Sequence, residues 1–212
     1  MKIIVFGASG ATGNNIVAQA LSSGWHVTAF ARSAGKLPMT HPNLRAFAGD
    51  VLDAAAVAAS MPGHDAVVIC LGRPARKAGT LRSEGTRNII AAMQAHGVPR
   101  LICQSSLGFG DSRNVLKSTS LVFRFVIVPL LLADTFRDHA RQETLVKDSG
   151  LDWTIVRPGN MTNGPLTENY HHGFQAHAQG LKVKVSRADV SHFILRQIQD
   201  RQYSRKAAGI SY

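Results

Sequence analysis

The chain of 212 residues contains only two cysteines, Cys70 and Cys103, and has no CxxC pair. Each thiol ends a short apolar run, AVVIC or RLIC, so we expect two buried strand thiols rather than a disulfide. No Cys/His spacing typical of a metal site occurs. The cysteine content therefore argues against a disulfide-stapled protein and against a metal centre, and favours a cytoplasmic protein.

Long hydrophobic runs are also missing. The longest apolar stretch, residues 121–133, is interrupted by Arg124 and Pro129 and is too short to cross a bilayer. The apolar run at 3–6 stops at Gly7, before the hydrophobic region of a signal peptide could be complete. We expect no membrane span and no signal peptide. For 121–133 an interfacial helix stays open, and a buried or lid-like helix is favoured.

Acidic residues are scarce: 13 Asp and Glu stand against 24 Lys and Arg, which gives a formal net charge of +11. A basic protein can bind nucleic acid. Here, however, the basic residues are scattered, with no run of five and no interleaving with aromatic residues. The pattern favours a surface that attracts small polyanions, such as a dinucleotide, over a nucleic-acid interface.

Short apolar runs alternate with helical patterns along the chain. The predicted strands, rich in Val and Ile, are 2–6, 26–31, 44–48, 66–71, 100–105 and 153–157. The predicted helices are 12–23, 53–60, 80–96 and 134–149, and several end at glycine. This succession predicts a doubly wound α/β fold, with a parallel sheet buried on both faces and helices on each side. Without a linker or repeat, we expect one domain over 1–212.

The glycines of GASGATG follow the first predicted strand at three-residue spacing, as Gly7, Gly10 and Gly13. In a Rossmann-type dinucleotide site the first glycine allows the turn, the second lets the backbone approach the pyrophosphate, and the third lets the helix pack closely. The helix beginning near Thr12 then points its free N–H groups at the phosphates. Because the motif lies between a strand and a helix, we interpret it as a dinucleotide loop rather than a plain turn.

The ends of the next strands indicate which dinucleotide binds. After the second strand stands Arg32, with Lys36 nearby, where NAD enzymes commonly place a carboxylate. A guanidinium can bind a 2′-phosphate that a carboxylate would repel, so we predict NADP over NAD. Asp50 is placed to accept from the adenine amino group. The predicted contacts beside the pyrophosphate and the nicotinamide ribose are Leu71, Gly72 and Arg73.

Several segments resemble the extended and atypical short-chain dehydrogenases/reductases over nearly the whole chain. The stretches GASGATG, GDVLD, SEGTRNIIAAMQAHGV, SGLDWTIVRPG and SRADVSHFIL are similar to the flavin reductase/biliverdin IXβ reductase group and its NAD(P)H-binding bacterial relatives. The resemblance implies a single-domain NADPH-dependent reductase. The cofactor contacts expected from the motifs and this resemblance are Gly7, Ser9, Gly10, Ala11, Thr12, Gly13, Arg32, Asp50, Val51, Leu71, Gly72, Arg73, Ser105 and Pro158.

The chain departs from the wider family at the proton donor, which is typically a Tyr followed four residues later by a Lys. No tyrosine precedes Tyr170, and the corresponding positions hold His139 and Glu143. Ser105 matches the family serine beside the nicotinamide. His139 is a candidate proton donor by residue type. Asn160 stands where biliverdin-reducing relatives carry a histidine, which argues against biliverdin itself.

The missing Tyr–Lys pair favours an acceptor that needs orientation more than a strong acid, such as a flavin, a quinone or a similar conjugated molecule. A flavin such as FMN would then be a substrate and not a prosthetic group. Residues 107–135 and 159–185 are expected on the substrate side, and the protein is expected to be a monomer or homodimer. The alternative is a non-catalytic NADP-binding redox sensor of the NmrA-like type.

Overall fold

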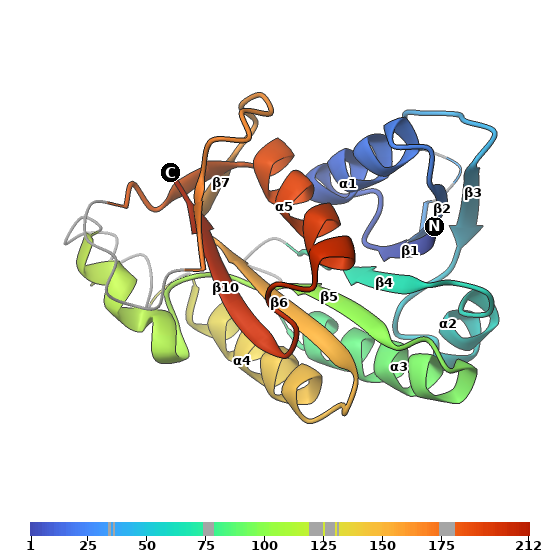
Figure 1. Cartoon of the computed structure of the whole chain (residues 1–212). Helices are drawn as coiled ribbons and strands as arrows, with labels where there is room; N and C mark the ends of the chain where they lie inside the picture. The colour runs from blue at the N-terminus through green and yellow to red at the C-terminus, as the bar shows by residue number, and fades with distance from the viewer. Residues whose placement is uncertain are drawn as a thin grey trace.

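Eight strands in the described residues form one sheet, in the order β3-β2-β1-β4-β5-β6-β10-β8 (Figure 1). The computed structural model describes residues 1–33, 35, 37–73, 79–118, 125, 130, 132–173 and 181–212. The sheet strands are β1 (Lys2–Phe6), β2 (His26–Ala31), β3 (Leu44–Ala48), β4 (Ala66–Ile69), β5 (Arg100–Gln104), β6 (Asp152–Pro158), β8 (His171–His172) and β10 (Lys206–Ser211). All neighbours pair in parallel except β8, which runs antiparallel to β10. The doubly wound fold is confirmed.

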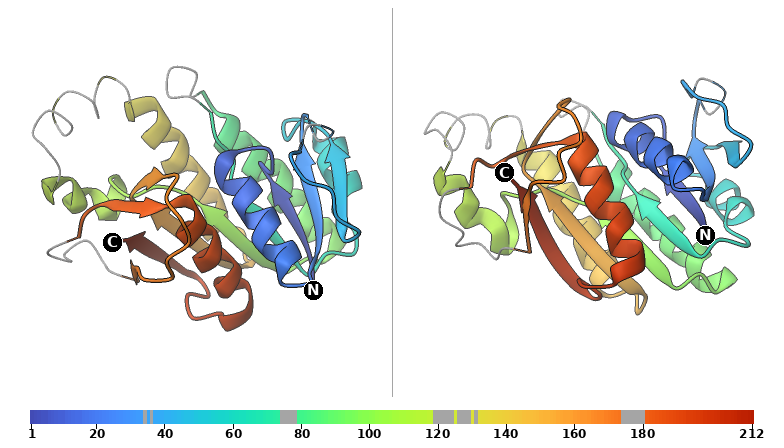
Figure 2. Two further views of the ribbon diagram at one scale, coloured as in Figure 1. Left: turned by 90° about the horizontal axis from the view of Figure 1, so that it is seen from above. Right: turned by 45° about the horizontal axis from the view of Figure 1, so that its top comes forward.

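Helices cover both faces of this sheet. They are α1 (Ala11–Ser22), α2 (Ala54–Ser60), α3 (Leu81–His96), α4 (Ala133–Lys147) and α5 (Arg187–Asp200). The helices α1 and α5 lie side by side on one face, as the views of Figures 1 and 2 agree. The helices α2, α3 and α4 cover the other face.

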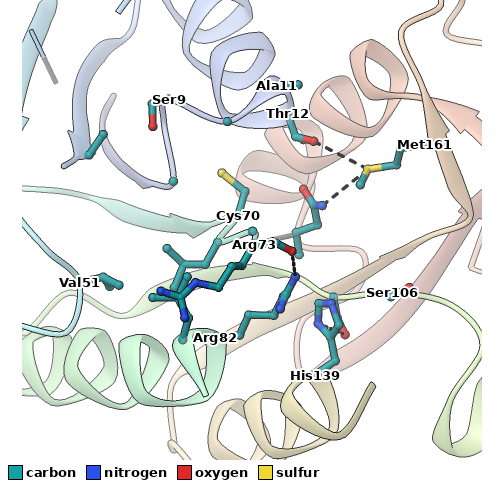
Figure 3. A pocket seen from close by; sticks show the side chains of 18 of the residues that line it. Ser9, Ala11, Thr12, Val51, Cys70, Arg73, Arg82, Ser106, His139 and Met161 are labelled. Atoms are coloured by element: carbon teal, nitrogen blue, oxygen red, sulfur yellow. Dashed lines mark hydrogen bonds between the residues drawn. The ribbon is translucent and has the colours of Figure 1, made fainter. Parts of the chain in front are cut away.

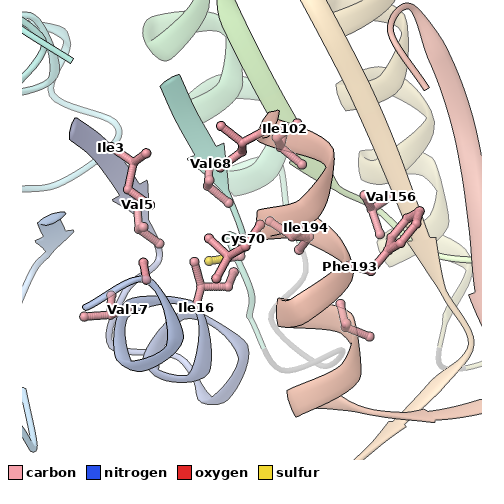
Figure 4. Close-up of a cluster of buried hydrophobic side chains, with 14 of the residues drawn as sticks. Ile3, Val5, Ile16, Val17, Val68, Cys70, Ile102, Val156, Phe193 and Ile194 are labelled. Carbon is pink, nitrogen blue, oxygen red and sulfur yellow. The ribbon is translucent and has the colours of Figure 1, made fainter. Parts of the chain in front are cut away.

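The alternation of side chains along the strands separates the two cores. Ile3 and Val5 of β1 pack with Ile16 of α1 and with Phe193 and Ile194 of α5 (Figure 4). Ile4 and Phe6, which alternate with them along β1, face the second core together with α2 and α3. Because successive residues of a strand point to opposite faces, a strand of continuous apolar residues must be buried on both sides. The two edge strands differ, since Arg45, Ala46 and Ala48 of β3 and both residues of β8 are exposed.

The last third of the chain holds elements that the apolar pattern did not predict. The helix α5 and the strand β10 complete the first core, and the short strands β7 (Asn160–Thr162) and β9 (Lys184–Ser186) pair outside the main sheet. The strand β10 reads KAAGIS, and its run of small residues has little of the Val and Ile character of the other strands. None of the helices in the described residues has the length and apolar character that a membrane span requires.

The expected substrate-side region is described only in part. A 3-10 helix occupies Gly110–Ser118. Lys36, residues 74–78 and parts of 107–135 and 159–185 lie outside the described residues.

Candidate functional site

A cavity of about 470 Å³ opens at the carboxyl ends of the parallel strands. This is the edge where doubly wound sheets bind their ligands. The predicted site residues that line the cavity are Gly7, Ser9, Gly10, Ala11, Thr12, Arg32, Asp50, Val51, Leu71, Gly72, Arg73, Ser105, His139 and Pro158. Figure 3 shows part of this lining, with the glycine loop on one side and His139 on the other. The turns after six strands thus meet in one cavity.

The glycine loop has the close contacts that a dinucleotide turn requires. Gly7 has a φ of +90°, and a Cβ added there would lie 2.5 Å from the carbonyl oxygen of Cys70. A Cβ on Gly13 would lie 2.2 Å from the Gly7 oxygen. Gly13 does not line the cavity because it lies beneath the loop, where it lets α1 pack against the turn.

The N-terminus of α1 faces the cavity without a side-chain cap. Gly10 is the N-cap residue, and it has no side chain that could accept from the first N–H groups. Ala11 and Thr12, the first helical residues, line the cavity. The positive end of the helix dipole and these N–H groups are suited to bind an anion such as a pyrophosphate.

Arg32 and Asp50 lie where β2 and β3 end. Arg32 is exposed at the mouth of the cavity, so its guanidinium can reach a ligand phosphate. The Oδ1 of Asp50 accepts from the backbone N–H of Leu52 at 3.0 Å, which orients the carboxylate beside the cavity. A basic residue after β2 and an acidic residue after β3 suit a 2′-phosphate and an adenine amino group, respectively.

Ser105, directly after β5, and His139 of α4 come together at the other end of the cavity. The Ser105 Oγ lies 3.4 Å from the His139 Nδ1, and the same nitrogen lies 3.2 Å from the Gln142 Oε1. The Gln142 Nε2 donates to the Thr86 Oγ1 at 3.0 Å. Because the amide oxygen only accepts, His139 Nδ1 must carry a proton, and the neutral ring keeps its lone pair on Nε2.

The structure argues against His139 as a proton donor in the free protein. Its side chain is buried, and burial, together with the positive charge of Arg82, lowers the pKa of His139 to about 4. At neutral pH the ring therefore has no imidazolium proton to give. From residue type alone we expected a pKa of His139 in the range useful for proton transfer, but burial of the ring lowers that pKa. Neutral His139 can accept a hydrogen bond or a proton.

Asn160 does not reach the cavity. Its side chain is exposed, while Gly159 and Met161, the residues on either side, line the cavity. Asn160 begins β7, and alternation along an extended chain directs neighbouring residues to opposite sides. The sulfur of Met161 accepts from the Thr12 Oγ1 at 3.7 Å and from the Gln104 Nε2 at 3.6 Å (Figure 3). Met161, not Asn160, is the residue of this segment in the site.

Glu143 and the tyrosines are also directed away from the site. Glu143 is buried in an ion pair with Arg157, whose Nε donates to its Oε1 at 2.8 Å. All three tyrosines belong to the described residues, and none of them lines the cavity. Instead, Tyr170, Tyr203 and Tyr212 bond to His192, His172 and Asp189. The described residues therefore place no phenol where the family has its proton donor.

Sequence reasoning missed part of the lining: Phe30, Ala31, Gly49, Cys70, Leu81, Arg82, Gln104, Gly159, Met161 and Arg187. Their polar members lie at strand ends or helix starts. Gln104 ends β5, and Arg82 and Arg187 stand in the first turns of α3 and α5. A search for polar residues at these boundaries would have found them, since boundaries at the carboxyl edge of the sheet face the ligand site.

Comparison with known proteins places the chain in a family. The fold and the cavity define a nucleotide-binding protein of the Rossmann type. A family model described as NAD(P)H-binding matches residues 7–201, and the chain belongs to this family. An uncharacterized chloroplastic protein of Arabidopsis thaliana is 32% identical over 178 residues, which are 79% of this chain and 62% of that protein. The chain thus spans less than two thirds of that relative's length.

Solved structures share the fold over the whole chain. A wide-type short-chain dehydrogenase/reductase from Veillonella parvula, in complex with NADP, has a TM-score of 0.81 at 17% identity, covering 100% of this chain and 94% of that one. ChuY, an anaerobilin reductase from Escherichia coli O157:H7, has a TM-score of 0.77 at 24% identity, covering 99% and 96%. These likenesses confirm the Rossmann-type fold, and the family match confirms the NAD(P)H-binding family that the resemblance implied.

Proposed function

We propose that this protein is an NADPH-dependent reductase whose acceptor is a flavin, a quinone or a similar conjugated molecule. The observation that carries the proposal is one continuous cavity. The glycine loop lies at one end, Ser105 and neutral His139 lie at the other, and none of the described lining residues is a tyrosine. This arrangement suits the binding and orientation of two ligands, and the described lining contains no phenolic acid of the kind that typical short-chain dehydrogenases use.

The residues present fit the nucleotide. The uncapped N-terminus of α1 and the turn at Gly7 suit the pyrophosphate, and Arg32 suits the 2′-phosphate. Gln104 adds a further feature, because among the described residues its buried Oε1 has no hydrogen-bond partner. An unused amide oxygen in the cavity suits the amino group of a carboxamide, such as that of nicotinamide. When bound, NADPH supplies the reducing equivalents.

The acceptor end can orient its ligand without giving it a proton. Ser105 is nearly fully buried, and its hydroxyl can donate to a carbonyl oxygen of the acceptor. The buried, aromatic side chains of Phe109 and His139 lie 6.0 Å apart between ring centroids and are close to parallel, at 18°. His139 lines the cavity while Phe109 packs against it, so a conjugated ring would meet the His139 ring and the Ser105 hydroxyl there. Water can deliver the proton, since such acceptors stabilise the added negative charge themselves.

The test is NADPH oxidation followed at the nicotinamide absorbance. FMN, riboflavin, a quinone and biliverdin are compared with a reaction without acceptor, and NADH serves as the cofactor control. We expect turnover that depends on the acceptor and favours NADPH. Tight NADPH binding without turnover on any acceptor would contradict the reductase and favour a non-catalytic NADP-binding sensor.

A further inference from the structure

Arg82 is a buried cation at the acceptor end of the cavity that the proposed reaction does not yet use. It stands in the first turn of α3 and is 6% exposed, yet it lines the cavity. Figure 3 shows its guanidinium between Arg73 and the ring of His139. A buried arginine normally has its donors occupied by acceptors of the protein.

The donors of Arg82 are largely unused. Its Nη2 lies 3.5 Å from the carbonyl oxygen of Arg73, at the limit of a hydrogen bond. Among the described residues, no group accepts a hydrogen bond from its Nε or Nη1. The nearest carboxylate oxygen, Asp138 Oδ2, lies 3.6 Å from Nη1, which is an ion-pair distance but too long for a hydrogen bond.

Asp138 cannot turn to satisfy the guanidinium because it already caps α3. Its Oδ2 accepts from the backbone N–H of Arg82, and its Oδ1 accepts from the backbone N–H of Ser83, each at 3.0 Å. The Ser83 hydroxyl donates to the same Oδ1 at 2.6 Å. A carboxylate at a helix N-terminus is stabilised by the dipole and by these N–H groups. The role of Asp138 is therefore to hold α3 in place.

The charges around the cavity indicate what Arg82 could bind. The described lining contains the cations Arg32, Arg73, Arg82 and Arg187, against a single carboxylate at Asp50. Arg32 and the glycine loop account for the phosphates of the dinucleotide. Arg82 is left beside His139 and Ser105, where the acceptor is expected. A carboxylate or phosphate pairs with a guanidinium along an edge that Nη2 shares with either Nε or Nη1. In Arg82 both Nε and Nη1 have no acceptor among the described residues.

We propose that Arg82 binds an oxyanion of the acceptor, a carboxylate or a phosphate, and so selects acidic acceptors over neutral ones. This inference rests on the proposed function and deepens it. The unused donors explain why a cation is kept in a buried position with only an ion pair to Asp138 at 3.6 Å, because the ligand completes its hydrogen bonds. An anion bound to Arg82 would also offset the positive charge that lowers the pKa of His139.

The first experiment measures binding without turnover. Benzoate and inorganic phosphate are titrated by calorimetry into the protein saturated with NADP⁺. We compare the wild type with Arg82→Met, which keeps a long apolar side chain, with Arg82→Lys, and with Arg141→Met. Arg141 lies exposed on α4 outside the cavity lining, so its substitution changes the net charge equally.

We expect at least one probe to bind the wild type and Arg141→Met, with affinity reduced roughly 10- to 100-fold in Arg82→Met. Arg82→Lys should keep part of the affinity. Failure of both probes to bind the wild type, or equal binding to Arg82→Met, would overturn the proposal. Because no acceptor is reduced in this experiment, its result is independent of whether the protein is a reductase.

The second experiment asks whether the oxyanion belongs to the acceptor. The kcat/KM values for FMN and riboflavin, and for a naphthoquinone with and without a carboxylate, are measured in the same variants. Arg82→Met should lose roughly 10- to 100-fold on the acidic member of at least one pair and little on its neutral partner. Equal losses within both pairs, or a weakened NADPH affinity in Arg82→Met, would overturn the assignment to the acceptor. Absence of turnover in every variant would instead be a failure of the proposed function.

Discussion

Arg157 and Arg82 are buried to the same extent, 6% exposed, yet they have opposite environments. Arg157, on β6, donates from Nε and Nη2 to Glu143 and from Nη1 to Asp111. Arg82 has one marginal hydrogen bond and an ion pair at 3.6 Å. Burial lowers the pKa of Arg82, whereas bonds to Glu143 outweigh burial and raise the pKa of Arg157. One arginine stabilises the fold, and the other has donors left for a ligand.

The largest expected effect is the difference in protein stability between the Arg157→Met and Arg82→Met variants. Arg157→Met should lower the free energy of unfolding by about 3–5 kcal/mol, because Glu143 stays buried without its hydrogen-bonded partner and with only the exposed Lys147 at 3.5 Å. Arg82→Met should change it by less than about 1 kcal/mol, since Asp138 keeps its bonds to α3. Urea unfolding at neutral pH measures both. Similar losses in the two variants would show that Arg82 is structural as well.

A second effect concerns the neutral state of His139. Its folded pKa, about 4, is depressed below the ordinary 6.5. The neutral ring therefore contributes stability above pH 6.5, and that contribution is lost as pH falls toward 4, where the unfolded chain binds the proton more readily. Between about pH 7.5 and about pH 5 the loss is about 2 kcal/mol of unfolding free energy.

Urea unfolding at these two pH values tests this expectation. His139→Gln should lose less stability on acidification than the wild type, by about that amount. The control is His26→Gln, because His26 is exposed at the start of β2 and lies outside the cavity. An unchanged pH dependence in His139→Gln would mean that the buried ring is not held neutral.

The third effect compares Arg82 with Arg32, the exposed arginine of the same cavity. Arg32→Ala should weaken NADPH binding about 10-fold and NADH binding much less, because only NADPH offers a 2′-phosphate to a guanidinium. Fluorescence titration of both nucleotides measures this, with Arg141→Ala as the control. Equal losses for the two nucleotides would contradict the NADP preference. Arg82→Met, in contrast, should leave the affinity for NADPH unchanged.

The smallest effect links Arg82 to its neighbour. Because the charge of Arg82 lowers the pKa of His139, Arg82→Met should raise it. Titration of the imidazole signals by NMR, assigned with His139→Gln, gives the value in each protein. Benzoate bound to the wild type should raise the pKa of His139 in the same direction. A pKa of His139 that is the same in wild type and Arg82→Met would place the guanidinium too far away to act on the ring.

Local patterns predicted much of the architecture. The strand ranges 2–6, 26–31 and 44–48 match β1, β2 and β3, because each is a short run bounded by turn residues. The helix α5 and the strand β10 were not predicted, since β10 lacks large apolar residues and depends on its neighbours β6 and β8 for its conformation. The antiparallel pairing of β8 is likewise set by a contact distant in sequence.

The two ends of the cavity also differ in how far the sequence alone predicts them. The glycine-loop end of the cavity follows from local sequence, because Gly7, Gly10 and Gly13 act on the turn and helix in which they stand. The opposite end of the cavity depends on tertiary structure, because Arg82 and His139 lie on α3 and α4 and Ser105 directly follows β5. Their burial, the neutral state of His139 and the unused donors of Arg82 depend on what packs around them. Desolvation and hydrogen-bond geometry are properties of the folded surroundings and not of residue type.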